Sequence, residues 1–108
     1  RLWENAADVG AYLLAGLQGL ESPLVGDVRG IGLMLAVELI DGSGSLLDGG
    51  RTSKIKAALK SAGVLVGQMS HAVLGPNSVL CLSPPLILTR GEADRIVDAF
   101  RTALPAGE

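Results

Sequence analysis

The chain has 108 residues, nine of them Lys or Arg and eleven Asp or Glu, so its formal net charge is −2. Because it has no basic cluster that would neutralise a row of phosphates, we expect no nucleic-acid partner. The longest apolar stretch, Ile31 to Ile40, is too short and too interrupted to span a bilayer, so we expect no membrane partner either.

The composition is apolar but almost free of aromatic side chains. Hydrophobic residues make up 48% of the chain, with one Trp, one Tyr and one Phe. We therefore expect an aliphatic core, and an apolar surface that meets something beyond these residues. The single cysteine, Cys81, cannot form an internal disulfide, which favours a reducing, cytoplasmic location.

Apolar residues at three- and four-residue spacing predict a helix from residue 1 to near Glu21–Pro23. Because the helical pattern begins without a capping residue, we expect a longer polypeptide whose missing part lies upstream. Next, Leu24–Gly30 and Leu33–Ile40 are predicted strands, joined at Gly30-Ile31-Gly32, where glycines permit a tight hairpin. The second strand is mostly apolar on both faces, so we expect it to be covered on both sides.

The middle of the chain combines a loop with a short helix. Residues Asp41–Gly50 are glycine-rich but lack the Gly-Lys-Ser/Thr ending of a phosphate-binding loop, so they are predicted to be an ordinary connection. The helix that follows is predicted to begin at a cap provided by Thr52 or Ser53 and to end at Gly63.

Two further strands are predicted at Val64–Gln68 and Val79–Leu82, with a loop over Ser70–Asn77 between them. The last helix has the clearest start, because Thr89 and Glu92 have the spacing of a capping box.

The order helix, two strands, helix, two strands, helix predicts a single α+β domain over residues 1–108. We expect a two-layer sandwich with a small, mainly antiparallel sheet of three to four strands packed with helices. Pro84 and Pro85 follow the last strand and lack backbone donors, so the sheet cannot continue through them. They form either one rigid wall of a pocket or a stiff link to the last helix.

Four segments, in order, resemble successive blocks of the C-terminal small domain of class III aminotransferases, the pyridoxal-phosphate enzymes of fold type I. They are ENAADVGAYLLAGLQGL, VGDVRGIGLMLAVELI, GVLVG and VLCLSPPLILTRGEADRIVDAF, and the match covers essentially the whole chain. The blocks VGDVRGIGLMLAVEL and SPPLILT are specific in combination. The resemblance implies transfer of an amino group from an amine or (ω-)amino acid to an oxo acid, with this domain closing the substrate side of the active site.

In such enzymes an upstream large domain supplies the lysine that binds pyridoxal 5'-phosphate. The lysines of this chain, Lys54, Lys56 and Lys60, have the spacing of a solvated helix face, so the resemblance implies no catalytic or cofactor-binding residue here. We therefore expect the piece to be inactive alone and to bind neither cofactor nor metal. The resemblance also implies a homodimer, with the large domain as partner and small amines and oxo acids as substrates.

Cys81 is the first candidate for the substrate pocket. Members of the family often place an arginine that clamps a substrate carboxylate three residues before the first proline of the PPL block, and that position is Cys81. Three explanations stay open. The enzyme uses amines or ω-amino acids and binds their carboxylate elsewhere, its function has drifted, or the block is aligned wrongly by a residue or two.

His71 and Arg29 are the other two candidates. Some relatives take a mobile arginine from the loop before this strand, but the loop Ser70–Asn77 has none, and His71 is its only titratable side chain. His71 either faces the pocket or is an ordinary loop histidine. Arg29 either contacts a substrate carboxylate or holds the shape of the domain through a structural ion pair or backbone hydrogen bonds. Glu38 is a candidate partner for such an ion pair. A nucleophilic Cys81 is not expected, because no His or basic cluster nearby would lower its pKa.

The alternative function belongs to another class: a stand-alone α+β module that binds a protein partner through its apolar surface, without catalysis. A start codon just before Arg1 would favour the module. A long upstream coding region with a strand-ending lysine would favour the enzyme.

Overall fold

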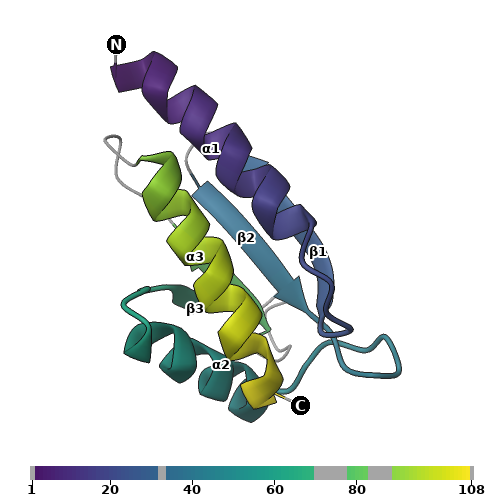
Figure 1. The fold of residues 1–108 in the computed structure, drawn as a ribbon. Coiled ribbons are helices and arrows are strands. Elements are labelled where there is room, and N and C mark those ends of the chain that lie inside the picture. Colours follow the sequence, from purple (N-terminus) through teal and green to yellow (C-terminus); the bar gives the residue numbers. More distant parts are fainter. Residues whose placement is uncertain (1, 32–33, 70–77, 83–88, 108) are drawn as a thin grey trace.

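The structure is a computed structural model, and it describes residues 2–31, 34–69, 78–82 and 89–107. The chain forms a sheet of four strands. Figure 1 shows the helices packed on one face of this sheet. The elements are α1 (Leu2–Gln18), β1 (Val25–Ile31), β2 (Met34–Leu39), α2 (Gly49–Ser61), β3 (Gly67–Met69), β4 (Val79–Leu82), α3 (Arg90–Ala103) and a final 3-10 turn (Leu104–Gly107). The predicted α+β two-layer sandwich is confirmed. Within the described ranges no helix is both long and apolar enough to cross a membrane.

The sheet has the strand order β1-β2-β4-β3, and every neighbouring pair is antiparallel. β4 therefore lies inside the sheet although it is the last strand in the sequence. The hairpin ladder continues until Ile31 pairs with Met34. Gly30 is part of β1, as the predicted strand Leu24–Gly30 has it, but Ile31 is also paired and belongs to the strand instead of the turn. Gly32 lies outside the described residues.

The core lies between the sheet and the helices. Leu35, Val37 and Leu39 of β2 are buried on this side, at 2% exposure or less. Fully buried side chains from all three helices meet them: Leu13, Leu17, Ile55, Leu59 and Phe100. The opposite side of β2 differs, because Met34 is 59% exposed and Ala36 and Glu38 are only half-buried. The prediction that β2 is covered on both sides is therefore wrong in the described structure, since all the helices pack on one face.

Two contacts hold α1 close to its neighbours. A Cβ atom added at Gly16 would lie 2.8 Å from Cγ2 of Val97, so the glycine allows α1 and α3 to approach closely. Gln18 Nε2 donates a hydrogen bond to the Val28 carbonyl oxygen at 3.3 Å. Both contacts fix α1 against the rest of the domain.

α2 begins earlier than predicted. Asp48 is its N-cap and accepts a hydrogen bond from the Arg51 backbone N–H at 2.8 Å. Thr52, expected as a cap, is instead buried inside the helix, where its hydroxyl donates to the Asp48 carbonyl oxygen at 2.9 Å. The cap and this buried contact outweigh the low helix propensity of the glycines at 49–50. The end at Gly63, with φ of 88°, is as predicted.

β3 is shorter than predicted. The Val64 backbone N–H donates to the Leu59 carbonyl oxygen, so this residue still belongs to the turn that ends α2. Pairing with β4 begins only at Gly67. The strand predicted from Val64 is therefore wrong in its first half, and Leu65 is 74% exposed.

β4 and the start of α3 are as predicted. Thr89 Oγ1 accepts from the Glu92 backbone N–H, and Glu92 Oε1 accepts from the Thr89 backbone N–H, both at 3.1 Å. This reciprocal capping box is the predicted one. Pro84, Pro85 and the loop Ser70–Asn77 lie outside the described residues.

Candidate functional site

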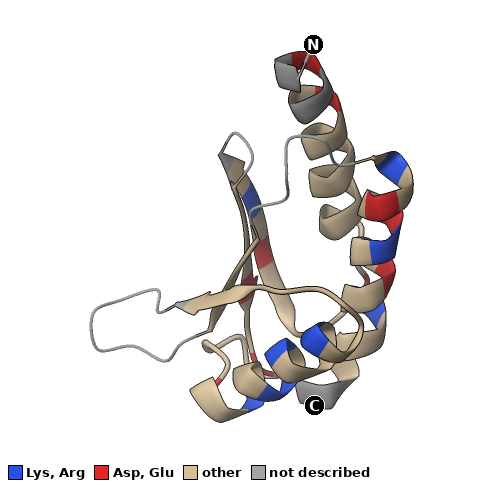
Figure 2. Cartoon of the chain, turned by 90° about the vertical axis from the view of Figure 1, so that its left-hand side faces the viewer, with Lys and Arg blue, Asp and Glu red and all other residues tan. Residues whose placement is uncertain are grey.

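The sheet has one face that the helices do not cover, which we call the open face. Figure 2 shows the sheet nearly edge-on, with α1 and α3 on one side of it. Successive side chains of a strand point to opposite faces, so the open face carries the residues between the buried ones. These residues are Asp27, Arg29, Met34, Ala36, Glu38, Gly67 and Cys81. Val79 lies on the same side of β4 but is itself buried, at 7% exposure.

Two of the three candidate residues lie in one row across this face. Arg29 is paired with Ala36, Ala36 with Cys81, and Cys81 with Gly67. We call these four residues the Arg29 row. Arg29 and Cys81 are two strands apart, which corresponds to about 10 Å. The third candidate, His71, lies outside the described residues.

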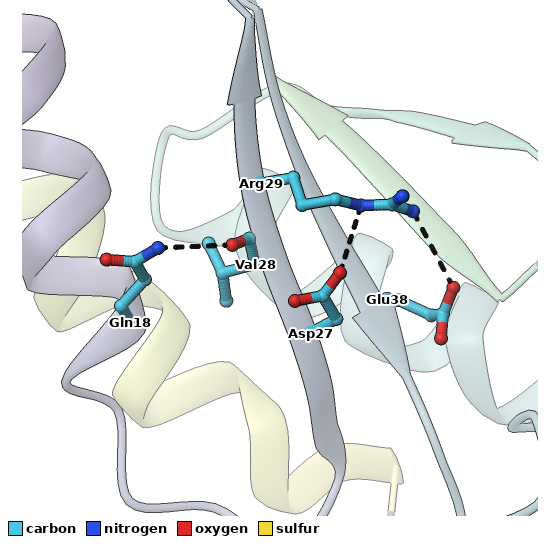
Figure 3. Close-up of polar contacts among 5 residues, drawn as sticks. All are labelled: Gln18, Asp27, Val28, Arg29 and Glu38. Atoms are coloured by element: carbon cyan, nitrogen blue, oxygen red, sulfur yellow. Dashed lines mark hydrogen bonds and ion pairs between the residues drawn. The ribbon is translucent and has the colours of Figure 1, made fainter.

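Arg29 is the centre of an ion-pair cluster that Figure 3 shows on the side of β1 away from α1. Its Nε lies 2.9 Å from Asp27 Oδ2, and its Nη2 lies 3.9 Å from Glu38 Oε2. The ion pair with Glu38, the candidate partner, is present in the structure, but it is longer than the pair with Asp27. Sequence reasoning missed Asp27. Because Asp27 lies two residues before Arg29 on the same strand, the two side chains are on the same face of the sheet.

The cluster carries more negative than positive charge. Two carboxylates and one guanidinium leave a net charge of −1. The side chains of Arg29 and Asp27 are 60% and 48% exposed, so the ion pair between them contributes at most about 1 kcal/mol. The cluster therefore orients Arg29 more than it stabilises the fold.

Cys81 lies near the end of β4 and is half-buried. Burial raises the pKa of its thiol above the usual value, because the low-dielectric surroundings disfavour the thiolate. A protonated thiol is a poor nucleophile, which agrees with the expectation that Cys81 is not one. It can instead form part of an apolar wall.

A shallow hollow of about 680 Å³ brings Arg29 and Cys81 into one lining. Met34 and Ala36 complete its side on the open face, and Leu14 and Gln18 of α1 lie on the other side of the sheet. The lining is mostly apolar, with Arg29 as its charged group.

The described residues that line the hollow do not fit a pyridoxal-phosphate site. Lys54, Lys56 and Lys60 are all exposed on α2, as predicted, and none lines the hollow beside Arg29 and Cys81. Within the described parts of the chain, no group of three or more His, Cys, Asp or Glu side chains could hold a metal ion. The arrangement thus offers a wall and an oriented cation, and the described lining contains no lysine for covalent catalysis.

Comparison with known proteins gives one consistent result. A family model described as aminotransferase class-III matches residues 1–104. The chain is 38% identical to an uncharacterized aminotransferase of Bacillus subtilis over 104 residues, covering 94% of this chain. It is 36% identical to the hypotaurine/taurine–pyruvate aminotransferase of Paracoccus denitrificans over 107 residues, covering 95% of this chain. In both comparisons the chain spans 23% of the relative's length.

Solved structures give the same result. An aminotransferase of Bacillus anthracis superimposes with a TM-score of 0.86 at 32% identity, over 96% of this chain and 24% of that one. A transaminase of the marine bacterium Virgibacillus superimposes with a TM-score of 0.85 at 30% identity, over 99% of this chain and 25% of that one. The architecture described above thus recurs as about a quarter of much longer chains.

Proposed function

The chain belongs to the class III aminotransferase family, and on this premise we propose that it is the C-terminal small domain of a pyridoxal-phosphate-dependent transaminase. The observation that carries the proposal is the match over residues 1–104 combined with the small share of each relative that it covers. The whole enzyme transfers an amino group from an amine or ω-amino acid to an oxo acid. This piece forms part of the substrate side of the active site.

Pyridoxal phosphate belongs, in this proposal, to the rest of the polypeptide. The three lysines of this chain are exposed on α2 and lie outside the hollow with Arg29 and Cys81. Covalent catalysis with this cofactor requires a lysine within reach of it. The 108-residue piece is therefore inactive alone.

The charges of the open face favour the proposed substrate class. A clamp for an α-carboxylate needs a guanidinium whose charge is not already neutralised. Arg29 has two carboxylates within 3.9 Å, so the cluster repels a further carboxylate. Cys81, at the position where relatives often have the arginine, carries a neutral, half-buried thiol. Simple amines therefore suit this wall best, and an ω-amino donor would have to place its anionic group away from this cluster.

The test is an assay of the full-length gene product with pyridoxal phosphate. We expect amino transfer from amines and ω-amino acids to pyruvate or glyoxylate, and no transfer by the 108-residue piece. Borohydride reduction should fix the cofactor to a lysine outside these residues. A full-length protein that transfers no amino group from any donor of the panel, or that only decarboxylates or racemises, would contradict the proposal.

Cys81→Arg in the full-length enzyme tests the substrate class. The new guanidinium should raise kcat/KM for donors with an α-carboxylate relative to simple amines, whereas Cys81→Ser should leave the ratio unchanged. A ratio that Cys81→Arg leaves unaltered would show that this position does not face the substrate.

The proposal includes a homodimer and a cytoplasmic location for the whole enzyme. Light scattering of the purified enzyme and fractionation of the source cells measure these two properties directly. The stand-alone interaction module remains the other hypothesis, and a gene that starts directly before Arg1 would support it.

A further inference from the structure

The exposed side of α2 combines small side chains with lysines. Three small residues at four-residue spacing share one exposed face of this helix: Ser53, Ala57 and Ser61. Three exposed lysines lie beside them: Lys54, Lys56 and Lys60. Within the described part of the chain, none of the three lysines takes part in an ion pair. These six residues form a flat surface with a positively charged rim, which we call the basic strip.

The exposed side of α1 has the same pattern with the opposite charge. Its small residues at four-residue spacing are Ala7, Ala11 and Ala15, and all three are exposed. Glu4 and Asp8 are exposed beside them, and α1 contains no Lys or Arg. We call these five residues the acidic strip. Ala15 also lines a hollow of about 630 Å³ between α1 and α3, which leaves room for side chains of another helix.

Figure 2 shows how the charges are divided among the helices. α2 contains four basic residues and no acidic one, whereas α1 contains two acidic residues and no basic one. α3 contains three of each sign, so its formal charges cancel. Two of its arginines already have partners, because Arg101 forms an ion pair with Asp98 at 2.7 Å and Arg90 lies 4.8 Å from the centre of the Tyr12 ring. The attraction between unlike charges is therefore strongest between the basic strip and the acidic strip.

The two strips of one molecule cannot pair with each other. α3 lies between α1 and α2 in the helix layer, and both strips point away from the core (Figure 1). A second copy of the chain can supply the missing partner of each strip. Because the helices all cover the same face of the sheet, one two-fold axis forms both contacts at once. Small side chains at four-residue spacing allow two helices to pack closely along these rows.

The helix side is large enough for a stable contact. The domain measures 42 × 27 × 20 Å, and 20 Å corresponds to one sheet and one layer of helices, each about 10 Å thick. The helix layer therefore presents the broad side, with an area on the order of 1,100 Å², more than the roughly 800 Å² that each partner of a standard complex buries. The proposed function turns the open face toward the substrate, so the helix side remains available.

We infer that the helix side is an interface between two copies of the enzyme, in which the basic strip of each copy packs on the acidic strip of the other. The lysines of one copy face Glu4 and Asp8 of the second, and Ala57 packs against Ala11 where the strips cross. Single exposed ion pairs contribute little, so specificity comes from the set of like charges on each strip. The interface goes beyond the proposed function, because it lies opposite the substrate side and leaves the open face free.

Charge reversal in the full-length enzyme tests this interface. One variant combines Lys54→Glu, Lys56→Glu and Lys60→Glu, and the other combines Glu4→Lys with Asp8→Lys. Light scattering over a range of concentrations should show about half the assembled mass for each variant, because like charges then meet and the Kd rises at least about 10-fold. An equal mixture of the two variants should regain the full mass, since every contact then joins opposite charges.

A control and a change of salt complete this experiment. Arg95→Glu, at an exposed position of α3 outside both strips, should leave the mass unchanged. Assembly of the unmodified enzyme should weaken in about 0.5 M NaCl, because salt screens exposed charges. A mass that neither reversal changes would overturn the inference, and so would a mixture of the variants that fails to regain the full mass.

Cross-linking separates a second copy from the remaining polypeptide as the occupant. Full-length chains with Ala11→Cys are mixed with chains with Ala57→Cys, and a short bis-maleimide is added at several dilutions. We expect a link between the two chains that decreases on dilution. Thiols that stay protected at every dilution would show that the remaining polypeptide covers the strips, which would overturn the inference. Amino transfer is assayed separately: linked copies without that activity uphold the interface and refute the proposed function, and an active enzyme without the link does the reverse.

Discussion

The two faces of the sheet use the same strands for different purposes. On the covered face Leu35, Val37 and Leu39 are at most 2% exposed and join the helices in one continuous core. On the open face Met34 is 59% exposed, and Arg29 carries an ion-pair cluster. The strict alternation along β2 shows that stability comes from one face, while the other face is available for contacts with different groups.

Phe100→Ala should have the largest effect, because it empties a fully buried position on the covered face. We expect the free energy of unfolding to fall by about 3–5 kcal/mol. Met34→Ala on the open face is the control and should change it by less than about 1 kcal/mol. Urea denaturation of the 108-residue chain measures both variants. Equal losses would show that the open face contributes to the core.

Gly16→Val should be the next most damaging change. Its Cβ would lie 2.8 Å from Cγ2 of Val97, a β-branched side chain that cannot easily rotate away. We expect the free energy of unfolding to fall by about 2–3 kcal/mol, because the added side chain pushes α1 away from α3. Gly42→Val, at a loop position where an added Cβ would meet no atom of a non-neighbouring residue within 4 Å, should be nearly neutral in the same denaturation experiment. If Gly42→Val were as damaging, the close approach of the helices would not be the cause.

Thr89→Ala should lower the free energy of unfolding by about 1 kcal/mol, because it removes the hydroxyl that accepts a hydrogen bond from the Glu92 backbone N–H in the α3 capping box. Thr102→Ala, at an exposed position within the same helix, controls for the change of residue type and should be neutral or slightly stabilising. Thermal unfolding followed by circular dichroism compares them. A Thr102 variant that loses as much stability would contradict the capping role.

The smallest expected effect is on the open face, where the alkylation rate of Cys81 should have a shifted pH dependence. Since burial raises the pKa of Cys81, its alkylation rate should rise at higher pH than that of Ser61→Cys in the same chain. The buried, protonated Cys81 thiol favours the folded state. This contribution to the free energy of unfolding is fully present below the pKa of the unfolded thiol and is lost as the pH rises through the pKa of the folded one. Cys81→Ser should remove this alkaline loss. Coinciding alkylation profiles would show that Cys81 is fully solvated.

Local signals in the sequence predicted much of the fold. The capping box at Thr89 and the glycine end of α2 at Gly63 involve contacts within a few residues, so their spacing was sufficient. The start of α2 was missed because Gly49 and Gly50 are typical of loops, and only the burial of Thr52 and the Asp48 cap outweigh that preference.

The candidate site was less accessible to sequence reasoning. Arg29 and Cys81 were each proposed separately, but their common row depends on β4 inserting beside β2, a register that local patterns do not contain. Asp27 was overlooked because both strands of the hairpin appeared mainly apolar. The exposure of Met34 could not be predicted either, since an apolar side chain gives no sign of which face the helices choose.

The position of β4 has a consequence for how the chain acquires its shape. β1 and β2 form a hairpin from neighbouring residues, which is a fast, local event. β3 pairs only with β4 in the described structure, so it has no ladder to join until residues 79–82 have left the ribosome. During synthesis the nascent chain therefore passes through a stage in which the edge of β2 that later pairs with β4 is still unpaired. Incorrect strand pairing is most favoured at this stage.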